Sequence, residues 1–155
     1  DGPGEYEVGG VMITGVRTFH DKQKGAERGS NTVFVIHMDD VVFCHLGDLG
    51  HDLTTHQLDE IGNVDVLFIP VGGDETIGPA EAVSVISQIE PRIVIPMHYA
   101  ASEQRSFTAD LASVEKFAHE VGLKEVVPEE KLNVTLANLP AEGEQTRFII
   151  MKPSN

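Results

Sequence analysis

Histidine and aspartate residues follow several apolar runs of this 155-residue sequence, at points where strands are expected to end. In layered α/β proteins, ligands and metals collect at the carboxyl ends of strands. Imidazole and carboxylate groups suit Zn, Mn or Fe, and a catalytic site needs about three such ligands with one position left for water. The pattern therefore predicts one metal site assembled from separate strand ends. Its candidate residues are His20, Asp48, His51 and His98.

Each of these residues has a simpler interpretation when it is taken alone, because a single histidine or aspartate beside a strand is more often structural. His45 lies within an apolar run and is more typical of a hydrogen-bonded core histidine than of a ligand. The other three of the seven histidines, His37, His56 and His119, are typical of surface or boundary positions. Only the combination of four residues in similar contexts favours a metal site.

Further residues near the candidate ligands could contact a substrate. Arg28 could meet an anionic group, although solvation at the surface is the simpler alternative. Asn31 could cap its loop or point at the site, and Tyr99 could donate to an oxyanion or pack in the core. The Gly-rich segment 71–78 lacks the Lys and the spacing of a P-loop. A loop whose glycines allow positive φ or a close approach of the backbone is favoured over a phosphate cradle.

The composition excludes several classes of protein. Acidic residues outnumber basic ones by 25 to 11, and no Lys/Arg cluster supplies the basic surface that nucleic-acid binding requires. No apolar run approaches the ~18 residues of a membrane span, and no signal peptide is recognisable. The single cysteine, Cys44, is typical of a small core residue. We therefore expect a cytoplasmic protein with a small-molecule substrate, and no nucleic-acid or membrane partner.

The elements that must hold the candidate residues begin as β-hairpins and then alternate between strands and helices. Turns are expected at Gly9-Gly10 and Asp39-Asp40, between β-branched or apolar runs. This order predicts the α/β class. The expected strands are 5–18 (as a hairpin), 31–38, 41–45, 64–70, 92–96, a short edge strand at 123–127 and a final pair at 131–136 and 146–151. The expected helices are 54–61, 79–90 and one from a cap at Thr108 or Asp110 to Val121.

Four motifs occur in a fixed order along the chain, and together they resemble a known family. They are Thr18-Phe19-His20-Asp21, Phe43-Cys44-His45-Leu46-Gly47-Asp48-Leu49-Gly50-His51, Val66-Leu67-Phe68-Ile69-Pro70-Val71-Gly72-Gly73 and Ile95-Pro96-Met97-His98-Tyr99. In this order they resemble the metallo-β-lactamase superfamily. More narrowly, they are similar to the small bacterial metal-dependent hydrolases that resemble L-ascorbate-6-phosphate lactonase.

The resemblance implies a role for each matching residue. His20, Asp48 and His98 would be ligands of a centre with one or two ions, Zn or alternatively Mn or Fe, and Asp48 would bridge two metals. Asp21 and His51 adjoin these positions and would orient ligands or transfer protons. Together with Asp48, His51 is thus a catalytic candidate. The implied activity is hydrolysis of an ester, lactone or phosphodiester by a metal-bound hydroxide that Asp48 orients, with Arg28 and Tyr99 as substrate-binding candidates.

One feature of the family is absent from this sequence, namely a His-x-His/Glu-x-Asp-His cluster that precedes the matching motifs. We therefore expect residues 1–155 to form a single domain, the C-terminal portion of a metallo-β-lactamase-type αββα sandwich with one sheet face lacking its cover. Such a domain is expected to associate with itself or with a segment that carries the cluster. The alternatives are a non-catalytic half-domain or assembly module with vestigial metal ligands, and a protein that only binds an anion or a metal.

Overall fold

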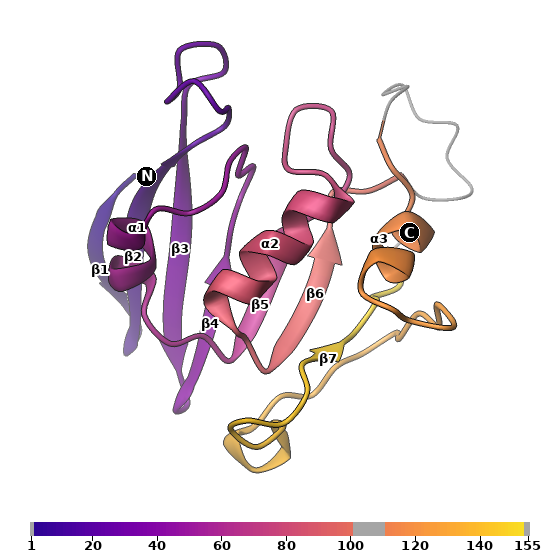
Figure 1. Cartoon of the computed structure of the whole chain (residues 1–155). Helices are drawn as coiled ribbons and strands as arrows, with labels where there is room; N and C mark the ends of the chain where they lie inside the picture. Colours follow the sequence, from indigo (N-terminus) through magenta and orange to yellow (C-terminus); the bar gives the residue numbers. More distant parts are fainter. Residues whose placement is uncertain (1, 101–110, 154–155) are drawn as a thin grey trace.

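The computed structural model of the chain describes residues 2–100 and 111–153, and these residues form a mixed sheet with helices on one face (Figure 1). Within them the sheet has seven strands, whose spatial order is their order in the sequence. The strands are β1 (Gly4–Val8), β2 (Val11–Phe19), β3 (Ser30–Met38), β4 (Val41–His45), β5 (Val66–Pro70), β6 (Ile93–Met97) and β7 (Arg147–Phe148). The α/β class predicted from the sequence is confirmed.

Strands β1 to β4 pair antiparallel through successive connections. The two-residue turn at Asp39-Asp40 is confirmed: both residues have positive φ, 50° and 61°. Positive φ at both central positions is the geometry that matches the right-handed twist of a hairpin. Aspartate tolerates this conformation because its short polar side chain can bond locally.

Strands β4, β5, β6 and β7 run parallel, so each connection between them must cross back over the sheet. Helices α1 (Thr55–Ile61) and α2 (Pro79–Ile89) make the first two crossings. Strand β2 runs in the same direction as β4, because two antiparallel pairings separate them. The carboxyl ends of β2, β4, β5 and β6 therefore lie along one edge of the sheet, which we call the carboxyl edge. The opposite one is the amino edge.

The helices begin where capping residues stop the extended chain. Thr54 and Gln57 form a reciprocal capping box at α1, and Pro79 occupies the first turn of α2. Helix α3 (Val114–Glu120) begins after Ser113, later than expected; the predicted caps Thr108 and Asp110 lie outside the described residues. Among the helices of the described ranges, none is both long and apolar enough to cross a membrane.

The main core lies between the sheet and the three helices. Alternate residues of neighbouring strands, such as Cys44, Leu67 and Val94, point to this face because side chains alternate along a strand. Ala82 of α2 and Phe117 of α3 pack against them. Burial raises the pKa of the Cys44 thiol to about 12, so this cysteine is an unreactive core residue, as predicted.

The other face of the sheet is covered in part by the C-terminal segment. Val66 and Ile93 form a second buried cluster, against which Leu132 and Leu139 pack. The predicted strand pair at 131–136 and 146–151 is wrong, because β7 pairs with β6 and residues 131–135 are irregular. The predicted edge strand at 123–127 is also irregular. Leu132 and Leu139 pack on the sheet face without joining a ladder, whereas Phe148 of β7 pairs with β6.

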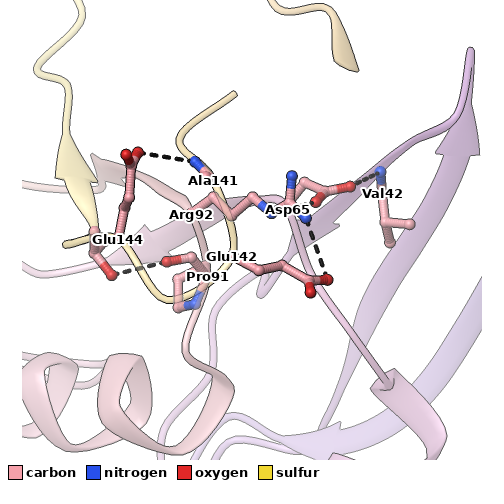
Figure 2. A network of polar contacts seen from close by, with 8 residues as sticks. Val42, Asp65, Pro91, Arg92, Ala141, Glu142 and Glu144 are labelled. Carbon is pink, nitrogen blue, oxygen red and sulfur yellow. Dashed lines mark hydrogen bonds and ion pairs between the residues drawn. The ribbon is translucent and has the colours of Figure 1, made fainter. Parts of the chain in front are cut away.

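A polar network closes the amino edge (Figure 2). The Asp65 carboxylate accepts from the Val42 N–H (2.8 Å) and pairs with Nε of Arg92 (3.3 Å). The guanidinium of Arg92 also lies 3.4 Å from the Glu142 carboxylate. This network ties the beginnings of the parallel strands to the C-terminal loop.

Candidate metal and substrate site

The three predicted metal ligands all lie on the carboxyl edge. His20 follows β2, Asp48 follows β4 and His98 follows β6. His20 is half-buried, whereas Asp48 and His98 are exposed. Within the described residues, none of these three side chains forms a hydrogen bond or an ion pair. The topology thus brings the three predicted ligands to one edge of the sheet.

Asp21, the neighbour of His20, has a different role, since its carboxylate organises the loop 21–29. One oxygen accepts from the N–H groups of Gln23 and Gly25 (both 2.8 Å). The other accepts from those of Glu27 (3.1 Å) and Arg28 (2.7 Å). Burial opposes ionisation of Asp21, but the four donors outweigh it and lower the pKa of the carboxyl group. With both oxygens committed to the backbone, Asp21 is a loop-forming residue.

The backbone of His20 is held from two sides. Its N–H donates to the Gly29 carbonyl (3.1 Å), which closes the loop that Asp21 organises. On the other side Gly50 packs directly against it: a Cβ added to Gly50 would overlap the carbonyl group of His20. The Gly50 N–H donates to the Phe19 carbonyl (3.0 Å). Glycine at this position therefore lets the segment after β4 touch the end of β2.

Both ring nitrogens of His51 are engaged. Its Nε2 accepts from the Phe19 N–H (3.0 Å), and its Nδ1 donates to the Asp52 carbonyl (2.7 Å). These two bonds define the neutral Nδ1–H tautomer. His51 therefore ties the end of β2 to the segment after β4. Its predicted catalytic role stays a prediction, and the bonds favour a structural one.

His98 has an unusual backbone for a residue with a side chain. Its φ is 51°, in the left-handed region, where a conformation is retained only if the surroundings impose it. Gly72, after β5, packs against it so closely that an added Cβ would overlap the His98 carbonyl oxygen. The close backbone approach favoured from the sequence for segment 71–78 is therefore present.

A cleft of about 480 Å³ lies beside His20, between the loop that begins at Asp21 and the segment 73–81. Arg28 lines it and donates from Nη1 to the Asp74 carbonyl (3.1 Å). Lys22 forms an ion pair with Glu81, and hydrogen bonding to that carboxylate raises the pKa of Lys22. Carboxylates outnumber cations along the lining, which consists of His20, Asp21, Lys22, Gln23, Glu27, Arg28, Gly50, Gly73, Asp74, Glu75, Thr76, Gly78 and Glu81. Asp48 and His98 lie outside it.

Tyr99, the second substrate-binding candidate, does not line this cleft. Its ring packs against the main core, and its hydroxyl donates to the Met151 carbonyl (3.4 Å). Burial and the negative charge of Glu115 raise the pKa of the phenol. Of the two alternatives for Tyr99, this placement favours packing.

The side-chain types of His20, Asp48 and His98 fit part of a metal centre. Two imidazoles and one carboxylate are the ligand types that Zn, Mn and Fe accept in proteins. However, in the ranges 2–100 and 111–153, no three His, Cys, Asp or Glu side chains lie close enough together to hold an ion. His20, Asp48 and His98 therefore share an edge without forming a complete ligand set of their own.

Comparison with known proteins shows the family. A sequence model of the beta-lactamase superfamily domain matches residues 1–98, and the chain therefore belongs to this family. A UPF0173 metal-dependent hydrolase of Thermococcus onnurineus is 37% identical over 98 residues, which are 62% of this chain and 44% of that protein. One from Pyrococcus horikoshii is 34% identical over the same length and with the same coverage. The chain thus spans less than half the length of these curated relatives.

Solved structures agree with this assignment. A protein of Thermotoga maritima, assigned as a Zn-dependent hydrolase of the metallo-β-lactamase superfamily, has a TM-score of 0.73 and 36% identity. The match covers 97% of this chain and 70% of that one. A metallo hydrolase of Ignicoccus hospitalis, at 21% identity, has a TM-score of 0.58 over 79% of this chain and 51% of its own length, which shows the fold alone. The superfamily inferred from the four motifs is confirmed.

Proposed function

We propose that this chain carries His20, Asp48 and His98 as ligands of the metal centre of a metal-dependent hydrolase. The observation that supports this proposal most strongly is a contrast within single motifs. In Thr18-Phe19-His20-Asp21 the carboxylate is consumed by four backbone bonds, whereas the imidazole has no partner among the described residues. In the motif at the end of β4, both ring nitrogens of His51 are hydrogen-bonded, whereas the Asp48 carboxylate has no partner among the described residues. His98, the third predicted ligand, likewise has no side-chain partner among the described residues and lies on the same carboxyl edge.

The substrate class is an ester, a lactone or a phosphodiester. A bound metal ion would supply Lewis-acid stabilisation of the charge that develops in such a reaction. The cleft beside His20 is the proposed place for the substrate, with Arg28 as its cationic contact. Because carboxylates dominate the lining, an anionic group would depend on local positive charge from Arg28 and the metal.

Metal binding by the chain tests the proposal. Titration calorimetry with Zn²⁺ and Mn²⁺ is expected to show binding to the unaltered chain. Affinity should fall at least tenfold in each of His20→Ala, Asp48→Ala and His98→Ala. His37→Ala is the matched control, because His37 is exposed on β3 and far along the strand from the carboxyl edge. No binding by the unaltered chain, or equal loss in the control, would contradict the proposal.

A second candidate is a non-catalytic half-domain that keeps these residues without using them. It is favoured by the finding that no three donors among the described residues are grouped to hold an ion. A panel of lactones, phosphodiesters and esters, assayed with added Zn²⁺ or Mn²⁺, separates the two functions. Turnover that Asp48→Ala abolishes supports the hydrolase, whereas metal binding without turnover supports the half-domain.

A further inference from the structure

Asn31, near the beginning of β3, binds two neighbouring segments of the carboxyl edge through one side-chain amide. Its Nδ2 donates to Oγ1 of Thr18 and to the carbonyl oxygen of Leu46, both at 2.8 Å. Its Oδ1 accepts from the backbone N–H of Asp48 (3.0 Å). The amide therefore connects the end of β2 with the turn that carries the predicted ligand.

The orientation of this amide is determined by its partners. The Leu46 carbonyl can only accept and the Asp48 N–H can only donate, so a reversed amide would lose both bonds. Thr18 is fully buried, and its hydroxyl donates to the backbone carbonyl oxygen of Asn31 (3.4 Å). Asn31 is thus held by β2 on one side while it holds Asp48 on the other.

The turn itself is built around the amide. Gly47 has a φ of 59°, and an added Cβ there would lie 2.5 Å from Oδ1 of Asn31. The Gly47 N–H donates to Nδ1 of His45 (3.1 Å). Consecutive backbone N–H groups, those of Gly47 and Asp48, are therefore bound by side chains from β4 and β3. The Asp48 backbone is fixed, and its carboxylate remains without a partner among the described residues.

We propose that Asn31 is a positioning residue for Asp48: it fixes the turn and thereby the place at which the carboxylate is presented. This inference rests on the proposed function, in which Asp48 is a metal ligand. Groups that orient metal ligands typically contribute about 10- to 100-fold to metal affinity. Sequence reasoning left Asn31 open between capping its loop and pointing at the site. The structure shows a third role, in which it binds the backbone of a candidate ligand.

The test compares Asn31→Ala with Asn63→Ala, a matched truncation of an exposed asparagine near the amino edge. Amide hydrogen exchange followed by NMR should show the Asp48 amide exchanging at least tenfold faster in Asn31→Ala, with β5 amides unchanged. Mn²⁺ affinity, measured by calorimetry, should fall about tenfold. Asn63→Ala should alter neither quantity. A merely structural role would instead speed exchange across the whole sheet and leave the affinity of the folded chain unchanged.

Thr18→Val provides a second variant of nearly the same shape, which removes the acceptor that holds the Asn31 amide. It should keep the Asp48 bond and give changes in both quantities that are smaller than in Asn31→Ala but larger than in the control. If Asn31→Ala does not fold, Thr18→Val decides by itself. The inference is overturned if, in the variant that folds, the Asp48 amide exchanges no faster than in Asn63→Ala. It is also overturned if the unaltered chain binds Mn²⁺ and that variant binds it as tightly as Asn63→Ala does. If the unaltered chain binds no Mn²⁺, the proposed function fails, while exchange still decides whether Asn31 holds Asp48.

Discussion

The two edges of the sheet use charged and polar side chains in opposite ways. At the amino edge Asp65, Arg92 and Glu142 contact one another, and Asp65 also satisfies a backbone N–H (Figure 2). At the carboxyl edge the imidazole of His20 and the carboxylate of Asp48 have no such partners in the described parts of the chain. At the amino edge the paired charges close the fold. At the carboxyl edge Lys22 and Glu81 also form an ion pair, but the His20 and Asp48 side chains have no partner among the described residues and are available for a ligand.

The carboxyl edge is also held together by hydrogen bonds, which come from different residues. Asp21, Asn31 and His51 spend their polar atoms on backbone groups and so hold the segments that present the candidates. Gly50 and Gly72 also pack closely against the backbone of His20 and His98, which holds these segments together. We therefore expect that, at this edge, substitutions of some residues lower the stability of the fold, whereas substitutions of others lower metal affinity alone.

The largest effect is expected from Gly72→Ala. Its Cβ would overlap the His98 carbonyl oxygen and lie 2.8 Å from a methyl carbon of Leu111. The Leu111 side chain can rotate away, but the contact with the His98 carbonyl cannot be relieved without moving a segment of backbone. We expect a loss of about 3 kcal/mol in the free energy of unfolding, measured by urea denaturation. Gly2→Ala is the control, because nothing lies within 4 Å of a Cβ there. Equal stability of the two variants would show that the carboxyl edge is loosely built.

Asp65→Ala tests the amino edge. It leaves the Val42 N–H without an acceptor and the Arg92 guanidinium without its less exposed partner, whose side chain is 16% exposed. We expect a loss of about 2 kcal/mol in the free energy of unfolding. Glu142→Ala removes the other partner of Arg92, which is 88% exposed, and should cost less than about 1 kcal/mol. Similar losses for the two variants would contradict a network centred on Asp65.

Asp21→Asn should make the protein less stable in a pH-dependent way. The folded state lowers the pKa of Asp21, so its ionised form contributes stability above the ordinary carboxyl pKa, near 4, and that contribution disappears as pH falls through the lowered value. The melting temperature of Asp21→Asn should therefore lie below that of the unaltered chain at pH 7 and approach it in acid. Asp59→Asn, at an exposed position of α1, should show no such convergence. A pH-independent gap would contradict the assignment.

The smallest effect on stability is expected from Asp48→Ala. Its carboxylate is exposed and bonds to none of the described residues, so the free energy of unfolding should change by less than about 0.5 kcal/mol. Metal affinity, in contrast, should fall at least tenfold under the proposed function. A large loss of stability would show that the Asp48 carboxylate is paired within the fold, as the charged groups of the amino edge are.

Much of the fold could be predicted from the sequence, because it depends on local patterns. The hairpin turns at Gly9-Gly10 and Asp39-Asp40 and the starts of α1 and α2, near residues 54 and 79, were predictable from residue types alone. The C-terminal segment was mispredicted because its apolar residues could serve a strand or a packed irregular chain equally well. Only the presence of an open sheet face beneath Leu132 and Leu139 distinguishes the two.

For the candidate site, too, part could be predicted from the sequence and part depended on the tertiary structure. By itself the sequence determined which residue types follow the strands, and its four motifs determined the family. The tertiary structure decided which of those residues remain uncommitted, because the partners of Asp21, Asn31 and His51 depend on how the segments meet. The bond between Phe19 and His51 spans 32 positions of the chain, and only the packing of β2 beside the segment after β4 brings the two together.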